Sequence, residues 1–238
     1  MLDYDGTLAP FSKERDKAFP YLGVRPIIKK ILSQGKTHLA IVSGRKIEEI
    51  AKLLNVSPLP EIWGEHGTEH LSTDGKHRFI NKEEKTISAI NLIYEQLLAH
   101  GLERFCEKKT TALALHWRGL NLDKKMQLQT IGLEIFNRYS MQENLSIHTF
   151  DGGIELRPSN YNKGNAVREI LKKNINIPSA YLGDDLTDED AFKALKKRGL
   201  SILVKEKHRQ TFADIRISPP KELIDFLEQW YKISLKEI

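Results

Sequence analysis

Two aspartates close to the start of the chain, Asp3 and Asp5 in the segment DYDGT (3–7), have the residue type and spacing for phosphoryl chemistry. Side chains alternate along a strand, so both carboxylates are expected on the same side. Like charges repel, and such a pair normally needs a cation or a shared proton. Carboxylate oxygens favour Mg²⁺, and one acid could attack phosphorus while the other transfers protons. The alternative is that these residues serve the geometry of a turn.

A second acidic segment, GDDLTDED (183–190), could supply further ligands for that cation. Asp184 and Asp185 are predicted to end a strand, and the acids that follow them to start a helix. Thr187 with Asp190 resembles a capping box, and acids stabilise a helix N-terminus. This structural explanation does not cover Asp184 and Asp185, because they precede the cap.

A serine and a lysine elsewhere in the chain could hold an anion. Ser43, in SGR (43–45), is a suitable N-cap for the following helix, and a helix N-terminus with a hydroxyl is also a phosphate site. Lys163, in NKG (162–164), lies near a predicted helix start, where the helix dipole disfavours a cation. A bound anion facing Lys163 would explain this placement. The alternative is an ordinary surface lysine.

These polar segments are all expected at the carboxyl ends of strands. Apolar runs predict strands, and apolar residues spaced by three and four predict helices such as 163–173. Alternating strands and helices favour a parallel sheet with crossover helices, in which ligands bind at the carboxyl ends of the strands. The predicted strands of this part lie within 37–44, 60–67, 179–185 and 201–205.

The middle of the chain has a different pattern, α-β-α-β-β, which predicts a small open-faced sheet in a separate lobe. Its expected elements are a helix near 83–99, a strand at the centre of 105–119, a helix near 122–138, and strands near 145–149 and 153–157. The chain is therefore predicted to have an α/β core of residues 1–82 and 158–238, interrupted by an α+β insertion of residues 83–157.

The composition narrows the class of protein. The 238 residues carry a net charge of +5, but the basic residues are scattered and no nucleic-acid motif is recognisable, so no nucleic-acid partner is expected. No stretch approaches the roughly 18 apolar residues of a membrane helix, and the N-terminus has no pattern of a secretion signal. The single cysteine, Cys106, fits a reducing compartment. We therefore expect a cytoplasmic protein that does not bind a membrane.

The four polar segments together, in this order, resemble the motifs of the haloacid dehalogenase-like (HAD) phosphatase superfamily. DYDGT (3–7), Ser43, Lys163 and GDDLTD (183–188) match its four motifs, and the resemblance spans the whole chain. It implies a Rossmannoid α/β core with a parallel sheet.

The resemblance also implies roles for these residues. Asp3 would be the nucleophile that becomes phosphorylated, and Asp5 the general acid and base. Asp3, Asp184 and the backbone carbonyl of Asp5 would hold Mg²⁺, with Asp188 nearby. The phosphoryl oxygens would be held by Ser43 and Lys163. Phosphoryl transfer depends mainly on positioning and charge neutralisation, which agrees with this set.

The insertion occupies the position of the superfamily's C2-type cap, which closes over the active site and selects the leaving group. Its sequence, with the turn GEHG (64–67), resembles the trehalose-phosphatase family, which has Glu-x-Lys, His-x-Arg and Glu-x-Arg-Pro segments. The matching substrate-binding candidates are Glu65, His66, Glu107, Lys109, His116, Arg118, Glu155 and Arg157. The family implies hydrolysis of trehalose 6-phosphate, a sugar-phosphate substrate, and functional pairing with a trehalose-6-phosphate synthase.

Three alternatives stay open. Relatives that act on other small sugar phosphates or on phosphoglycerates share the core motifs. A catalytically silent regulatory module is disfavoured because Asp3, Asp5 and Asp184 are all present. The polar residues of the insertion could simply form the solvated face of its sheet. Only Met1 and Leu2 precede Asp3, so either the first strand is shorter than the usual five or six residues or the sequence lacks a few native residues before it.

Overall fold

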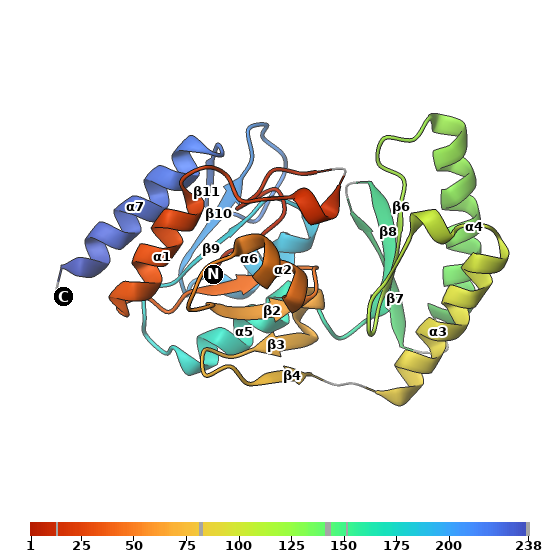
Figure 1. Ribbon diagram of the computed structural model, residues 1–238, viewed down its shortest axis with the longest axis horizontal. Coiled ribbons are helices and arrows are strands. Elements are labelled where there is room, and N and C mark those ends of the chain that lie inside the picture. Colours follow the sequence, from red (N-terminus) through yellow and green to blue (C-terminus); the bar gives the residue numbers. More distant parts are fainter. Residues whose placement is uncertain (13, 81–82, 141–143, 151, 237–238) are drawn as a thin grey trace. The chain divides into compact units, whose positions relative to one another are not determined.

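The computed structural model describes residues 1–12, 14–80, 83–140, 144–150 and 152–236, which form two compact units (Figure 1). The first unit contains Met1–Arg78 and Asn162–Ile238, and the second contains Phe79–Tyr161. Residue 82, the predicted boundary of the insertion, lies outside the described residues. Both units combine helices with a sheet, and the predicted α/β fold is confirmed.

The first unit is built mainly on parallel strands, with the start of the chain in the middle; the third strand, residues 69–71, runs antiparallel to its neighbour. One set of strands has the order β1-β2-β3-β4 and the other the order β11-β10-β9. Leu2 forms parallel bridges to both β1 and β9, so residues 1–3 join the two sets. The strands are β1 (Ala40–Val42), β2 (Glu61–Gly64), β3 (Glu69–Leu71), β4 (His77–Phe79), β9 (Ala180–Gly183), β10 (Leu200–Val204) and β11 (Ile215–Ile217).

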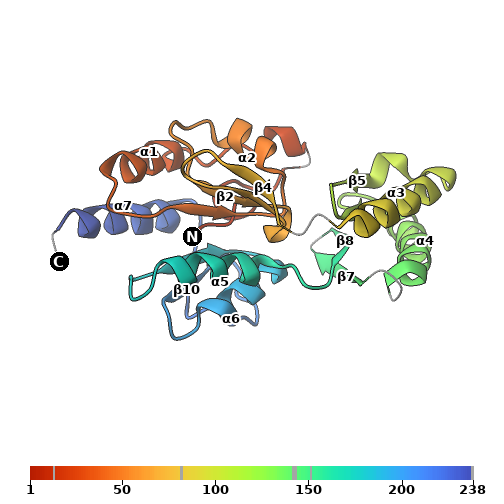
Figure 2. The same ribbon diagram turned by 90° about the horizontal axis from the view of Figure 1, so that it is seen from below.

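Helices cover both faces of this sheet (Figure 2). On one face lie α1 (Val24–Gln34), α2 (Ile47–Leu54) and α7 (Lys221–Leu235), whose apolar residues share one core with β1 and β9. On the other face lie α5 (Lys163–Lys173) and α6 (Glu189–Leu195). The 3-10 helices of this unit are η1 (Arg15–Lys17), η2 (Glu65–Gly67) and η4 (Leu186–Asp188).

The helix ends follow from local sequence. The apolar face of α1 recurs every three or four residues, and the C-cap that follows Gln34 is Gly35, which has a left-handed φ of 70° that favours glycine. Helix α5 begins at Lys163, where the predicted helix began. The side chain of Asn162 accepts a hydrogen bond from the backbone N–H of Asn165, and the reverse contact completes a capping box.

The second unit has a four-stranded antiparallel sheet of order β5-β6-β8-β7. Helices α3 (Glu84–Ala99) and α4 (Leu122–Ser140) pack on one face of it through an apolar core (Figure 1). The strands are β5 (Cys106–Lys108), β6 (Leu113–His116), β7 (Leu145–Phe150) and β8 (Gly153–Pro158), and η3 (Glu103–Phe105) precedes β5.

Some elements differ from the sequence prediction. The segment 105–119 holds two antiparallel strands rather than one, so the second unit reads α-β-β-α-β-β. The reason is a turn, closed by a 2.9 Å hydrogen bond from the N–H of Lys109 to the carbonyl of Ala112, which folds the polar half of the segment back on the apolar half. The short strands β3, β4 and β11 were also missed. Among the described residues, no helix has both the length and the apolar character to cross a membrane.

Candidate active site

A buried lysine lies between two aspartates at the carboxyl end of the central strands. The ammonium nitrogen Nζ of Lys163 donates to Oδ1 of Asp3 at 2.7 Å and to Oδ1 of Asp188 at 2.8 Å. All three residues are buried, and each comes from a different part of the first unit: the segment after Leu2, the start of α5, and the end of η4. Burial opposes the charge of Lys163, but Asp188 and Asp3 outweigh it and raise the pKa of Lys163 above its usual value.

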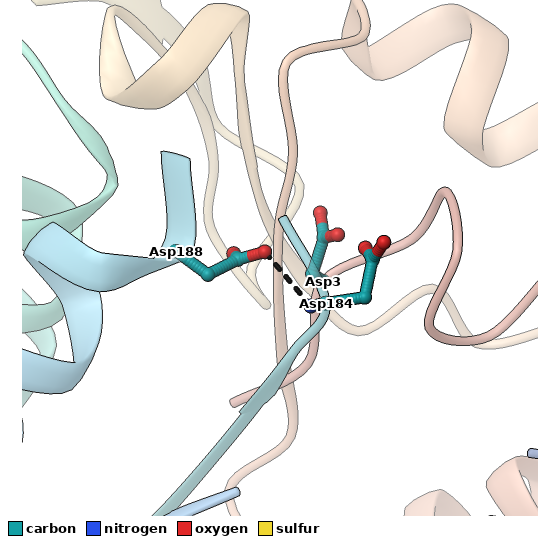
Figure 3. Close-up of side chains that lie close together, drawn as sticks. All are labelled: Asp3, Asp184 and Asp188. Atoms are coloured by element: carbon teal, nitrogen blue, oxygen red, sulfur yellow. Dashed lines mark hydrogen bonds between the residues drawn. The ribbon is translucent and has the colours of Figure 1, made fainter. Parts of the chain in front are cut away.

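Asp184 completes a cluster of three acids (Figure 3). Carboxylate oxygens of Asp3, Asp184 and Asp188 all lie within 4.8 Å of one another. Burial raises the pKa of Asp3 to about 8, the charge of Asp188 adds to this rise, and Lys163 opposes it. Burial, followed by the charges of Asp3 and Asp188, also raises the pKa of Asp184 well above its usual range. Because three buried carboxylates repel one another, this site is more stable with protons or with a bound cation.

The residues present fit a divalent metal ion. Asp184 is 1% exposed, and its Oδ1 has no hydrogen-bond partner among the residues that the structure describes. The hydroxyl of Thr7 is also buried without such a partner. A buried, unsatisfied carboxylate oxygen beside two other carboxylates is a donor set for a hard cation such as Mg²⁺.

Gly6 makes room for this carboxylate. A Cβ atom on Gly6 would lie 2.3 Å from Oδ2 of Asp184, and Gly6 has a left-handed φ of 77°. Both the conformation and the close approach therefore require glycine at this position. The DYDGT segment brings Asp3 to the cluster and provides the space in which Asp184 lies.

Asp188 is held by several donors. Its Oδ1 accepts from Lys163 and from the hydroxyl of Tyr181 at 2.7 Å, and its Oδ2 accepts from the backbone N–H groups of Asp184 and Asp185 at 3.0 Å. Asp185 and Asp188 thus form the capping box of η4. The prediction that Thr187 and Asp190 form the box was wrong, because a 3-10 turn intervenes between β9 and α6 and moves the cap toward the strand.

Ser43 is buried in the turn after β1. Its Oγ accepts a hydrogen bond from the N–H of Arg45 at 3.2 Å, and its carbonyl accepts from the N–H of His66 at 2.9 Å. Helix α2 begins at Ile47 with Lys46 as its N-cap, so the prediction that Ser43 caps the helix was wrong. The hydroxyl caps a local turn, which ends before the helix starts.

The two aspartates of DYDGT have different surroundings. Asp5 is partly exposed, and both of its carboxylate oxygens accept from Arg45, at 2.6 and 2.7 Å. Arg45 is itself buried and also donates to the carbonyl of Arg15 at 2.8 Å. Asp3 is instead next to Lys163. Sequence reasoning did not single out Arg45, although its place in the SGR turn was a signal.

Glu65 and His66 lie in η2, directly after β2. Both are buried, and both have a left-handed backbone, with φ of 45° and 57°. Residues other than glycine rarely adopt this conformation, and such positions cluster at functional sites. The imidazole of His66 packs against Gly44, where a Cβ atom would lie 2.6 Å from the ring. The turn that contains Glu65 and His66 therefore packs directly on the turn that contains Ser43 and Gly44.

The second unit gathers most of its predicted site residues on the polar face of its sheet. Glu107, Ala114, Glu155 and His148 lie opposite one another on the four strands. Nζ of Lys109 lies 2.5 Å from Oε1 of Glu155. Further contacts are Nε2 of His116 to Oε2 of Glu107 at 2.7 Å, and Nη1 of Arg157 to Oε2 of Glu155 at 3.5 Å.

One predicted residue of the second unit lies off the polar face of the sheet, and two residues that were not predicted lie on it. Arg118 is exposed and lies beyond the end of β6, beside Gly152, so the structure does not place it in the row of Glu107 and Glu155. Ser146 and His148 belong to the polar face, and Nδ1 of His148 is 3.3 Å from Nη2 of Arg157. Sequence reasoning missed both; their alternate positions along β7 were the available signal.

A model of the trehalose-phosphatase family matches residues 1–217. This chain belongs to the trehalose-phosphatase family. The family resemblance inferred from the sequence is thereby confirmed, and the match extends through both units.

The names of individual similar proteins agree with the family match. A trehalose-phosphate phosphatase of Mycobacterium marinum is 28% identical over 244 residues, which cover 95% of this chain and 59% of the relative. The chain thus spans about three fifths of that relative's length. A solved structure of a trehalose-6-phosphate phosphatase related protein has a TM-score of 0.80 and 26% identity, and covers 98% of this chain and 97% of its own.

The fold is also that of a wider superfamily. A haloacid dehalogenase-like hydrolase from Bacteroides thetaiotaomicron has a TM-score of 0.68 over 96% of this chain and 97% of its own, with 16% identity. This likeness shows the HAD-like fold that was predicted for this member of the trehalose-phosphatase family. The roles of the individual site residues stay predictions.

Proposed function

We propose that this chain is a Mg²⁺-dependent phosphatase that hydrolyses trehalose 6-phosphate to trehalose and phosphate. The observation that carries the proposal is the buried constellation in which Asp3 contacts Lys163 and shares a cluster with Asp184 and Asp188. Membership of the trehalose-phosphatase family supports the choice of substrate.

Asp3 is proposed as the nucleophile. One of its carboxylate oxygens forms a bond to phosphorus while the bond from phosphorus to the sugar oxygen breaks, which gives an aspartyl phosphate. Water then attacks phosphorus, and its oxygen replaces that of Asp3, which returns as a carboxylate. Attack requires the charged form of Asp3; burial raises the pKa of Asp3 to about 8, the ammonium of Lys163 at 2.7 Å opposes that rise, and a bound cation would oppose it further.

Asp5 is proposed as the acid and base. It donates a proton to the departing sugar oxygen and later accepts one from the attacking water. Because both oxygens of Asp5 accept from Arg45, proton transfer requires that one of these hydrogen bonds opens. Arg45 thereby orients the carboxylate of Asp5, which lies in the same segment as the nucleophile Asp3.

The metal is proposed to be Mg²⁺, held by Asp3, Asp184 and the backbone carbonyl of Asp5, with Asp188 nearby. When bound, it would neutralise charge on the phosphoryl group and on Asp3. Ser43 and Lys163 are proposed to hold the phosphoryl oxygens. Lys163 is suited to this role because its ammonium already contacts Asp3.

The sugar is proposed to be recognised by charged side chains that offer both donors and acceptors, as the hydroxyls of a disaccharide require. Lys109 and Glu155 are buried and paired, which preorganises them at little cost in side-chain freedom. The proposed sugar-binding residues are Glu65, His66, Glu107, Lys109, His116, Arg118, Glu155 and Arg157.

Phosphate release from a panel of substrates tests this function. The panel contains trehalose 6-phosphate, glucose 6-phosphate and a phosphoglycerate, each with Mg²⁺ and with excess chelator. We expect release from trehalose 6-phosphate in Mg²⁺ alone. A preference for another member of the panel would favour a different sugar-phosphate phosphatase, full activity in chelator would contradict the metal, and no release from any of them would favour a silent module.

The biological setting stays a prediction. A cytoplasmic location rests on the single cysteine, Cys106, which fits a reducing compartment. Functional pairing with a trehalose-6-phosphate synthase rests on the family alone. Copurification from native extract, with synthase activity measured in the bound fraction, tests that pairing.

A further inference from the structure

The loop of residues 205–214, between β10 and β11, contacts the turn that carries the acid cluster. Nη2 of Arg209 donates to the carbonyl of Asp185 at 2.9 Å. Nε and Nη2 of Arg209 are each 3.4 Å from the carbonyl of Asp184. One guanidinium therefore contacts two successive peptide groups just after β9.

Arg209 also contacts the other end of the same turn. It forms an ion pair with Glu189, the first residue of α6. The carboxylate of Glu189 further accepts from the hydroxyl of Thr211 at 2.9 Å and from the N–H of Phe212 at 2.7 Å. The loop thus contacts residues 184–189 at both ends. Arg209 itself contacts the carbonyls of Asp184 and Asp185 at one end and the carboxylate of Glu189 at the other.

These contacts of Arg209 affect the orientation of Asp184 in particular. Oδ1 of Asp184 has no hydrogen-bond partner among the described residues, and Oδ2 is 3.9 Å from Nζ of Lys205. Close hydrogen bonds to its own carboxylate therefore do little to orient this side chain. Its direction follows from its backbone, and the carbonyl of that same residue is where Arg209 binds.

We propose that Arg209 is a positioning residue that orients Asp184 for a divalent metal ion. This inference rests on the proposed function only in requiring a metal at the acid cluster. Partners that orient metal ligands typically change metal affinity by ten- to a hundred-fold when they are removed. Arg209 would act in this way through the backbone and without touching the metal.

Binding of Mn²⁺, as a paramagnetic substitute for Mg²⁺, tests the proposal without any substrate. The loss of the free-ion signal in electron paramagnetic resonance gives the dissociation constant. We expect Arg209→Ala to raise that constant about ten-fold or more. Arg209→Lys retains the charge but lacks the forked guanidinium that contacts both ends of the turn, so we expect an intermediate value.

Arg216→Ala is the matched control. Arg216 lies just beyond the same loop and donates to the carbonyls of Lys205 and Glu206 rather than to those of Asp184 and Asp185. Its loss should change the Mn²⁺ dissociation constant less than about two-fold. Thermal unfolding in chelator measures stability in each variant, and Arg209→Lys carries the test if Arg209→Ala does not fold.

Three outcomes would overturn the proposal. They are an unchanged Mn²⁺ affinity in both Arg209 variants at any stability, an equal loss of affinity in Arg216→Ala, and no Mn²⁺ binding by the wild type. Failure of the proposed function has a different signature. In that case the wild type binds Mn²⁺ and the Arg209 variants lose affinity, but no sugar phosphate is hydrolysed.

Discussion

The ammonium nitrogen of Lys163 lies 2.7 Å from Oδ1 of Asp3, across a sequence separation of 160 residues. The same nitrogen is 2.8 Å from Oδ1 of Asp188. One buried positive charge therefore holds together two carboxylates that would otherwise repel each other. This relationship couples the stability of the first unit to the chemistry proposed for its site.

Replacing Lys163 by methionine should reduce both stability and activity. The two carboxylates would lose their buried counter-charge, and breaking a buried pair costs about 3–5 kcal/mol of the free energy of unfolding. Phosphate release should fall at least about a hundred-fold, because a phosphoryl-binding charge near the nucleophile is lost. Urea unfolding and a phosphate-release assay on Lys163→Met measure the two effects.

Lys172→Met on the same helix is the control. Lys172 is exposed, and its ion pair with Glu169 at 2.6 Å is worth little in solvent. We expect a change below about 0.5 kcal/mol and unaltered activity. Similar losses in the two variants would contradict a special role for Lys163.

Gly6→Ala should disable the metal site. The new methyl group would lie 2.3 Å from Oδ2 of Asp184 and displace that carboxylate, in addition to the strain of a left-handed φ. We expect loss of Mg²⁺-dependent activity together with lower stability.

Gly35→Ala separates the two effects, because Gly35 has a φ of 70° and no heavy atom would meet its Cβ within 4 Å. It should cost about 1–2 kcal/mol and leave activity intact. Full activity in Gly6→Ala would refute this view of the site.

Lys109→Ala should act on substrate choice. Lys109 is buried against Glu155, and loss of a charged hydrogen bond to a sugar should lower kcat/KM for trehalose 6-phosphate about ten- to a hundred-fold. Glu107→Ala should behave in the same way. Hydrolysis of p-nitrophenyl phosphate, which lacks the sugar, should change much less. The exposed neighbour Lys108, mutated to alanine, is the control. Equal losses on the two substrates would mean that Lys109 supports folding rather than specificity.

His38 and Glu61 should make stability depend on pH. The hydrogen bond that His38 donates to the carboxylate of Glu61 raises the pKa of His38 above 6.5, against the effect of burial. Burial raises the pKa of Glu61, but the hydrogen bonds from His38 and His70 outweigh it and lower that pKa from 4.5 to about 2. The contribution of Glu61 is present above pH 4.5 and lost toward pH 2, whereas that of His38 is complete below pH 6.5 and lost as pH rises through its folded pKa.

His38→Gln tests this window. It should lower the free energy of unfolding by about 0.5–1 kcal/mol near pH 5.5, and by less near pH 9. His100→Gln, whose ring contacts the carbonyl of Gln96 on an exposed helix end, is the control for the loss of an exposed histidine. A difference between wild type and His38→Gln that grows with pH would show that the sign is wrong.

The core of the site could be predicted from sequence because its motifs are short and local. Asp3, Lys163 and Asp184 each lie at the carboxyl end of a strand or at a helix start, and topology brings such ends together. The pairing of Asp5 with Arg45 could not be read in this way, because 40 residues separate them and only the folded turns determine which side chain faces which.

Local signals also failed where a short turn shifted an element. Ser43 has the residue type of an N-cap, but α2 starts at Ile47 after an intervening turn. The strand β5 consists only of Cys106, Glu107 and Lys108, so its apolar alternation was too brief to recognise. His148 was missed because its role depends on register with Glu155 across β7 and β8, which the sequence of either strand alone does not specify.

The most direct test of the account is to locate the phosphoryl group during turnover. Wild-type protein is mixed with trehalose 6-phosphate and Mg²⁺, quenched in acid within one turnover, digested, and sequenced by mass spectrometry, with Asp3→Asn in parallel. We predict a phosphorylated carboxylate at Asp3 in the wild type, and neither label nor steady-state phosphate release in Asp3→Asn. Phosphate release by a verified Asp3→Asn protein, or a label on a residue other than Asp3, would contradict the account.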